Sequence, residues 1–372
     1  MPARQVNQSN TTVINSQYQQ QLNDSAGQLA IDETGSVWFL GGSSGFHFLQ
    51  KSCQFRNGAF YFPYNDFEKN GSSKFYQIVH QTELHLKEIP PKDLSDHLIE
   101  LYFDHHQPIL PVFENKMEFM KALEENRCSH IALNALYAIA SRFSEDPRVQ
   151  LEPGKSETAG NIFFERAKRL LNEDNDLSSI STIQALILMA VHQNDLFRPA
   201  RACKYAGMAF LMAQNLGLYR SYELWSLPPS ECEHRARVFW CCYVLDRILS
   251  ATYGMPMTFD DYNIDYSEAL PILESNTQEL PEERQGPSII IKDFTHVIHL
   301  CKILGRILRT FYWKSGSTIS IDETYVRFNN DLNDWQKHLP QHLRDFSSTN
   351  VCQLHMMYHT ITILLHRPFI QD

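Results

Sequence analysis

The feature that most constrains the fold is a stretch at residues 235–256 that, as a helix, has two largely apolar faces. One face carries apolar residues at three- and four-residue spacing, namely Val238, Cys242, Leu245 and Leu249. The second face carries Trp240, Tyr243, Arg247 and Ser250 at the same spacing. A helix with two such faces is enclosed by neighbours on most of its circumference. We therefore predict a central helix, around which the rest of the chain is arranged.

Turn-forming and capping residues bound this predicted helix. Pro228 and Pro229 precede it, and Ser230 with Glu233 has the spacing of a capping box. In a capping box the serine side chain accepts a hydrogen bond from the third backbone amide of the helix. Gly254 and Pro256 are expected to end the helix, because glycine permits the backbone of a C-terminal cap and proline cannot continue a helix.

Asp246 and Arg247 form a charged pair inside this otherwise apolar helix. Buried charges are tolerated when they are paired and hydrogen-bonded, so we expect the pair to be held in a specific network. The functional interpretation makes the pair a switch that links the helix to its neighbours, and the structural one makes it an ion pair that supports the fold. We favour the structural interpretation, because arginine binds carboxylates in enclosed sites whatever the function.

This stretch resembles the fungal-specific transcription factor domain, the helical middle homology region that follows the binuclear zinc cluster (Zn2Cys6) in fungal regulators such as xylanolytic activators. The resemblance rests on a basic residue, an aromatic pair ending in Trp, a Tyr, an Asp-Arg pair, a small residue and Gly-x-Pro. These are Arg237, Phe239, Trp240, Tyr243, Asp246, Arg247, Ser250, Gly254 and Pro256. Residues 93–112, 261–265 and 358–369 resemble further family segments in the expected order, so the resemblance covers about residues 31–370.

Composition narrows the classes of protein that this chain can represent. The 372 residues are 43% hydrophobic with a formal net charge of −10, and this acidic balance argues against nucleic-acid binding by the chain itself. The eight cysteines include no C-x-x-C pair, which predicts reduced thiols and no structural zinc site. No apolar run approaches the roughly 20 residues that cross a bilayer, so we expect an intracellular protein without a membrane partner.

Three regions follow one another along the chain. Residues 1–30 are rich in Gln, Asn, Ser and Thr and are predicted to be disordered. Residues 31–89 contain short aromatic and aliphatic runs between Gly and Ser, which predict a small β-hairpin-like element and a connector. Residues 90–372 contain amphipathic segments joined by Pro/Gly loops, which predict an all-α fold class, an irregular array of about ten helices. The resemblance implies that the domain is truncated at its C-terminal end.

Histidine pairs are the only candidates for metal binding, and neither is convincing. His105 and His106 are adjacent and point to different helix faces. His355 and His359 share a face, but they lack the glutamate of the H-E-x-x-H motif and a third ligand. Packing or hydrogen bonding is the preferred interpretation of both pairs. Because motifs for nucleotide binding and for nucleophilic catalysis are also missing, we expect no enzyme, no catalytic residue, no metal and no cofactor in this chain.

The resemblance also implies a function. It implies control of RNA polymerase II transcription in the nucleus, with DNA bound by a zinc cluster that this chain does not contain and zinc present only there. The implied partners are transcriptional co-regulators, a small-molecule effector and a second copy of the protein. The domain itself is expected to restrain activation surfaces or to bind a metabolite or co-regulator between helices. Two alternatives are a helical scaffold subunit of a chromosomal assembly and a helical enzyme with a metal at His355 and His359.

Overall fold

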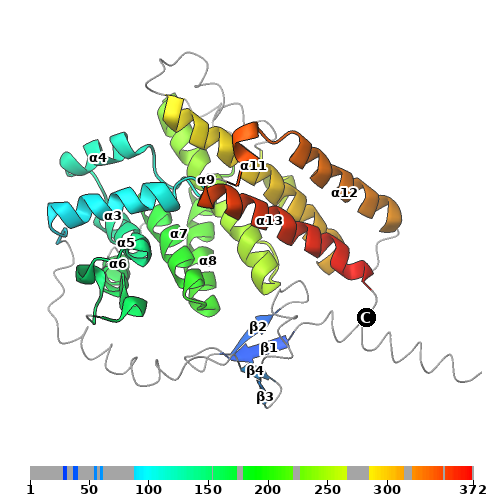
Figure 1. The fold of residues 1–372 in the computed structure, drawn as a ribbon, viewed down its shortest axis with the longest axis horizontal. Helices are drawn as coiled ribbons and strands as arrows, with labels where there is room; N and C mark the ends of the chain where they lie inside the picture. The colour runs from blue at the N-terminus through cyan, green and yellow to red at the C-terminus, as the bar shows by residue number, and fades with distance from the viewer. Residues whose placement is uncertain are drawn as a thin grey trace, which may run out of the picture.

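The structure, a computed structural model, describes residues 28–31, 37–40, 54–56, 59–61, 88–152, 154–173, 179–220, 227–265, 285–313, 321–346 and 348–370. Within these residues there are ten α-helices, which confirms the predicted all-α array (Figure 1). They are α3 (Lys92–His105), α4 (Lys116–Glu124), α5 (His130–Ala140), α6 (Asn161–Glu173), α7 (Ile180–Asp195), α8 (Pro199–Asn215), α9 (Pro229–Tyr253), α11 (Gln285–Leu308), α12 (Ile321–Lys337) and α13 (Thr349–His366).

Four short strands precede the helices and form one small sheet. They are β1 (Gln28–Ile31), β2 (Val37–Leu40), β3 (Gln54–Arg56) and β4 (Ala59–Tyr61), in the order β2-β1-β4-β3. Strand β1 pairs antiparallel with β2 and parallel with β4, while β3 pairs antiparallel with β4. Most of the predicted disordered segment and of the predicted β-hairpin-like element lies outside the described residues. Both assignments, and the predicted region boundaries, therefore stay predictions.

Helices α5, α7 and α8 form the core of an N-terminal layer. Helix α5 is buried along nearly its whole length, from Ile131 to Ala140. Four alanines of helix α8 lie on one face and are almost completely buried: Ala202, Ala206, Ala209 and Ala213. Because alanine side chains are short, the axes of α7 and α8 can approach closely along their length. Helices α3, α4 and α6 complete this layer (Figure 1).

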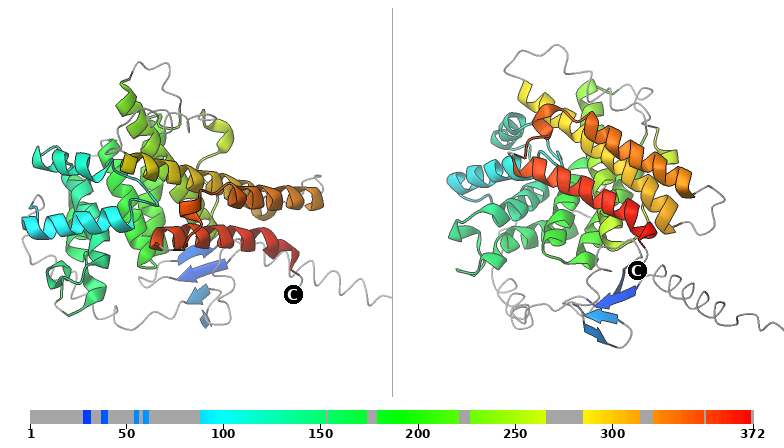
Figure 2. Two further views of the ribbon diagram at one scale, coloured as in Figure 1. Left: turned by 45° about the horizontal axis from the view of Figure 1, so that its top comes forward. Right: turned by 45° about the vertical axis from the view of Figure 1, so that its right-hand side comes forward.

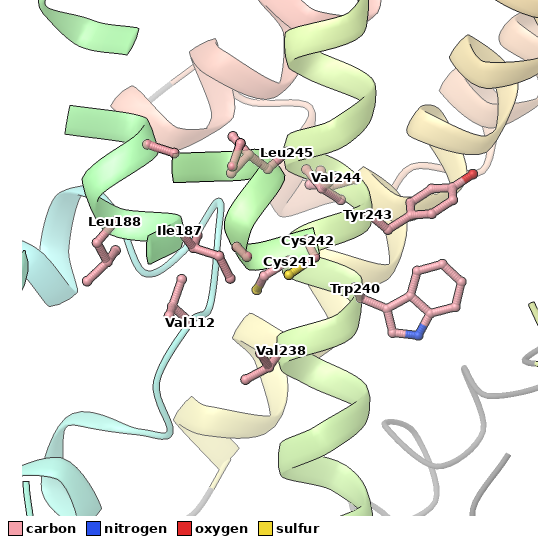
Figure 3. Packing of buried hydrophobic residues seen from close by; sticks show 14 of the residues in the cluster. Val112, Ile187, Leu188, Val238, Trp240, Cys241, Cys242, Tyr243, Val244 and Leu245 are labelled. Carbon is pink, nitrogen blue, oxygen red and sulfur yellow. The ribbon is translucent and has the colours of Figure 1, made fainter. Parts of the chain in front are cut away.

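Helix α9 runs through the middle of the molecule, as its sequence predicts (Figure 2). Every residue from Ala236 to Arg247 is buried. Figure 3 shows the two faces: Val238 and Leu245 point toward α7, whereas Trp240 and Tyr243 point to the opposite side. Helices α11, α12 and α13 form a C-terminal layer on that opposite side. The central helix therefore joins the two layers.

The two ends of α9 differ in how well the sequence predicted them. Gly254 caps the C-terminal end with left-handed backbone at φ +68°, which confirms the prediction. The predicted capping box at Ser230 and Glu233 is wrong, because the helix already begins at Pro229 and has no side-chain cap. Proline suits the first helical position, since it has no N–H that needs a partner there. Ser230 therefore lies inside the first turn and not ahead of it.

Candidate functional site

Arg247 is the centre of a buried hydrogen-bond network on α9. Its side chain is fully buried, and its Nη1 donates to Oδ2 of Asp246 at 2.5 Å. Its Nη2 donates to the backbone oxygen of Phe259 at 2.9 Å and to Oδ1 of Asp261 at 2.8 Å. The guanidinium is thus bound both to its own helix and to the loop that follows it. The ion pair expected from the sequence is present, and it extends to a second carboxylate.

Asp246 is held from the other side by the backbone of the same loop. Its carboxylate accepts from the amide of Thr258 at 2.9 Å and from the amide of Phe259 at 3.3 Å. Burial raises the pKa of Asp246, while Arg247 and these two amides oppose that rise. Three donors around one carboxylate match its ionised form, so the charge has the partners that burial requires.

Tyr243 adds an aromatic surface and one more hydrogen bond. The guanidinium carbon of Arg247 lies 4.1 Å from the centre of the Tyr243 ring, which is a cation–π contact. The Tyr243 hydroxyl donates to Oδ1 of Asp261 at 2.7 Å. Burial raises the pKa of Tyr243, so the hydroxyl remains a donor. Asp261 lies in the segment with Asp260 and Asp265 that follows α9, which we call the acidic loop, and it receives two donors from α9.

Helix α11 closes the network at Gly305. A Cβ atom at this position would lie 2.8 Å from Nε of Arg247 and 3.3 Å from its Cδ. Glycine is therefore what allows α11 to lie against the guanidinium. At the end of α11, Nη2 of Arg309 lies 3.0 Å from Oδ1 of Asp260. The acidic loop is consequently fixed between α9 and α11.

The remaining residues that carry the family resemblance lie elsewhere on α9 or just after it. Arg237 is buried, and its guanidinium nitrogens lie 3.7 Å from Glu114 and 3.8 Å from Glu233. Trp240 packs edge-on against the Tyr243 ring, and Nζ of Lys302 lies 5.0 Å from the centre of the Trp240 ring. Gly254 and the exposed Pro256 form the helix end.

The structure thus brings together Tyr243, Asp246 and Arg247, but not Arg237, which lies about 15 Å away along the helix. The contacts of Tyr243, Asp246 and Arg247 join α9 to the loop that follows it.

The histidine pairs do not converge on a shared ligand position. His105 stacks on Phe143 at a ring distance of 4.5 Å. His355 is buried and lies 2.8 Å from the backbone oxygen of Leu343, while His359 is exposed. In the described part of the chain no group of three or more His, Cys, Asp or Glu residues could hold a metal ion.

The cysteines and the long helices add no further site. The cysteines in the described ranges are free thiols, and burial raises the pKa of Cys241 and Cys242, which makes their thiolates scarce. None of the described helices combines the length and apolarity that a membrane crossing requires.

A pocket of about 350 Å³ lies between the C-terminal layer and the segment after α3. Apolar side chains from α11, α13 and the turn before α13 line it, among them Val297, Leu343 and Leu354. Asp293 and His342 also line it, and Oδ1 of Asp293 lies 2.8 Å from Nε2 of His342. Sequence reasoning missed this pocket because its walls come from four segments that are far apart in the chain.

Comparison with known proteins gives consistent matches. A family model described as the fungal specific transcription factor domain matches residues 99–344. The nitrogen assimilation transcription factor nirA of Emericella nidulans is 28% identical over 98% of this chain and 42% of its own length. The nitrogen assimilation transcription factor nit-4 of Neurospora crassa is 27% identical over 93% of this chain and 33% of its own length.

A third relative is the cutinase transcription factor 1 alpha of Fusarium vanettenii, which is 26% identical over 91% of this chain and 38% of its own length. This chain therefore spans less than half of the curated relatives it matches. No solved structure matches the chain.

Proposed function

Because the chain belongs to the family of the fungal specific transcription factor domain, we propose that it is the regulatory region of a zinc-cluster transcription factor. The observation that carries this proposal is the family match over residues 99–344, which includes all of α9 and its network. In the proposed protein, a zinc cluster outside the present sequence binds DNA, and the whole protein controls RNA polymerase II transcription in the nucleus. Zinc is needed only for that cluster.

The proposed task of the domain is to restrain or expose activation surfaces. A rigid central helix that joins two layers suits this task, because a change in one layer is carried to the other through packed contacts. The proposal includes transcriptional co-regulators, a small-molecule effector and a second copy of the protein as partners. It assigns no catalytic residue and no enzymatic activity to the chain.

The scaffold alternative is not favoured. The relatives reported above are named transcription factors, and the further matches include transcriptional regulatory proteins of Schizosaccharomyces pombe. None of these relatives is named as a subunit of a chromosomal assembly.

A reporter assay tests the proposed role. The 372-residue chain is placed between a heterologous DNA-binding domain and a strong activation domain, and transcription is compared with the same fusion carrying Asp246→Ala. We expect the wild-type chain to lower activation several-fold, and the variant to release it, because loss of this carboxylate removes one of the two charged partners of the buried Arg247 and loosens the fold. Immunoblotting checks that both fusions accumulate equally. Equal transcription from the two fusions at equal abundance contradicts a restraining role.

A further inference from the structure

We propose that the pocket between α11, α13 and the segment after α3 binds a small organic cation with an apolar body. This inference goes beyond the family assignment, which places no ligand in this chain. It rests on the proposed regulatory function only for its biological meaning, since binding can be measured without any readout of transcription.

The size and lining of the pocket suit the body of such a ligand. Its volume of about 350 Å³ is at the lower end of the range of small-molecule sites. Val297, Leu343, Val351 and Leu354 contribute apolar walls, and each of these residues is at most 7% exposed. Walls that belong to the packed core keep their positions, so they form a surface that exists before a ligand arrives.

The charge of the pocket favours a cation over an anion. Asp293 is an acidic residue in the lining, and within the described residues no lysine or arginine lines the pocket. The nearby Arg344 is turned away, because its Nε donates to the backbone oxygen of Leu339 at 2.7 Å. A carboxylate accepts several hydrogen bonds, so Asp293 can bind an ammonium group in addition to His342. A ligand carboxylate at the same place meets the like charge of Asp293.

The pocket lies where the two layers meet, which gives its occupancy a structural effect. Pro108 and Ile109 form one wall and follow α3 of the N-terminal layer, whereas the other walls belong to the C-terminal layer. Beside the pocket, Nδ2 of Asn350 on α13 donates to the backbone oxygen of Asp104 on α3 at 3.3 Å. A ligand that touches both layers stabilises the arrangement in which they lie together.

The binding test uses two phenylalkyl probes of the same carbon number and opposite charge, 4-phenylbutylamine and 4-phenylbutyrate, with the 372-residue chain. Binding is followed by the melting temperature and by NMR of 13C-labelled methionine methyl groups. Met357 lines the pocket, whereas its neighbour Met356 does not and is 67% exposed. We expect a saturable change at the Met357 methyl with the amine, at roughly millimolar concentration for so small a ligand. We expect no such change with the acid.

Variants distinguish binding of the amine in the pocket from non-specific binding of the amine to an acidic protein. With the melting temperature as the readout, Met357→Trp fills the pocket and should abolish the response to the amine, while the matched control Met356→Trp should keep it. Asp293→Asn should weaken binding about tenfold, which is the loss expected for one charge-assisted hydrogen bond.

The proposal is overturned if the amine response persists in Met357→Trp, or if the acid binds as well as the amine. It is equally overturned if wild-type protein gives no saturable response to the amine. None of these outcomes bears on the reporter assay, so failure of the ligand site is distinguishable from failure of the regulatory role.

Discussion

Helices α9 and α13 show that the charge content of a helix does not decide how deeply it is buried. Helix α9 carries Asp246 and Arg247, yet these side chains are 2% and 0% exposed. Helix α13 contains no Asp, Glu, Lys or Arg among its 18 residues, yet Met356 is 67% exposed and Ile363 is 55% exposed. What separates the two helices is the number of neighbours that cover them.

The difference arises from position in the array. Helix α9 lies between the two layers and is covered on both faces, and its buried Asp246 and Arg247 find partners in the loop at residues 258–261. Helix α13 packs on α11 and α12 (Figure 1), and another face of it, which carries Met356 and Ile363, is exposed. We call the surroundings of α9 the closed region and the outer face of α13 the open region. A substitution in the closed region should lower the free energy of unfolding far more than the same substitution in the open region.

The largest effect is expected from Asp246→Ala in the closed region. The variant leaves a fully buried guanidinium without its main carboxylate, which should lower the free energy of unfolding by about 3–5 kcal/mol. In a domain of this size the melting temperature should fall by about 10 °C. Differential scanning calorimetry measures both quantities.

The matched control for this variant is Asp265→Ala, which breaks an ion pair with Arg220 whose side chains are 45% and 50% exposed. This control should lower the free energy of unfolding by less than about 1 kcal/mol. Equal losses in the two variants would show that Asp246 is not enclosed. Replacing the pair by Asp246→Leu and Arg247→Met together should recover part of the loss, since apolar residues of similar volume need no partner.

An acid-sensitive stability is expected from a histidine in the N-terminal layer. His192 is 1% exposed, and burial with nearby arginines lowers its pKa to about 3. Below pH 6.5 the unfolded chain therefore binds a proton at this residue that the folded chain does not bind, so folding weakens as the pH falls. The loss is about 1.4 kcal/mol per pH unit, or about 2 kcal/mol at pH 5. Urea unfolding at pH 7 and pH 5 measures it.

The variant His192→Leu removes this proton linkage and keeps an apolar contact with Phe164, on which the imidazole stacks. Its stability should fall about 2 kcal/mol less between pH 7 and pH 5 than that of the wild type. His106, whose pKa burial lowers to about 4, remains in both proteins and accounts for residual sensitivity. An identical pH dependence in the two proteins would exclude His192 as its source.

Two glycine-to-alanine variants compare the closed region with an open helix position by adding a single methyl group. Gly305→Ala places a methyl group 2.8 Å from Nε of the buried Arg247 and should cost about 1–3 kcal/mol. Gly207→Ala, in α8, meets nothing within 4 Å and should be neutral or stabilising by about 0.5–1 kcal/mol, because alanine favours a helix. Thermal unfolding of the two proteins should therefore shift in opposite directions.

The smallest effect is expected in the open region. Ile363→Glu puts a charge on the exposed face of α13 and should change stability by less than about 0.5 kcal/mol. Ile361→Glu, two residues away on the same helix, buries the charge at a position that is 1% exposed and should destabilise strongly. Circular dichroism during urea unfolding compares them. Similar losses would mean that the outer face of α13 is covered.

The sequence predicts the helical array and the place of α9 well, and the reason is physical. Apolar spacing on two faces requires cover on two sides, and a charged pair in such a helix requires partners. The start of α9 was not predicted, because the Ser230 capping pattern competes with a proline that begins the helix first. The role of Gly305 and the presence of the pocket could not be predicted from the sequence, because both depend on contacts between segments that are distant in the chain.

The way in which Arg247 is held has a consequence for how the molecule opens. One guanidinium bonds to α9 and to the following loop, and α11 covers it at Gly305. The loop cannot leave α9 without removing hydrogen-bond partners from Asp246 and Arg247, and α11 shields this network from solvent at Gly305. Backbone amides of α9, of Thr258 and of Phe259 should then exchange with solvent hydrogen together, as one cooperative unit.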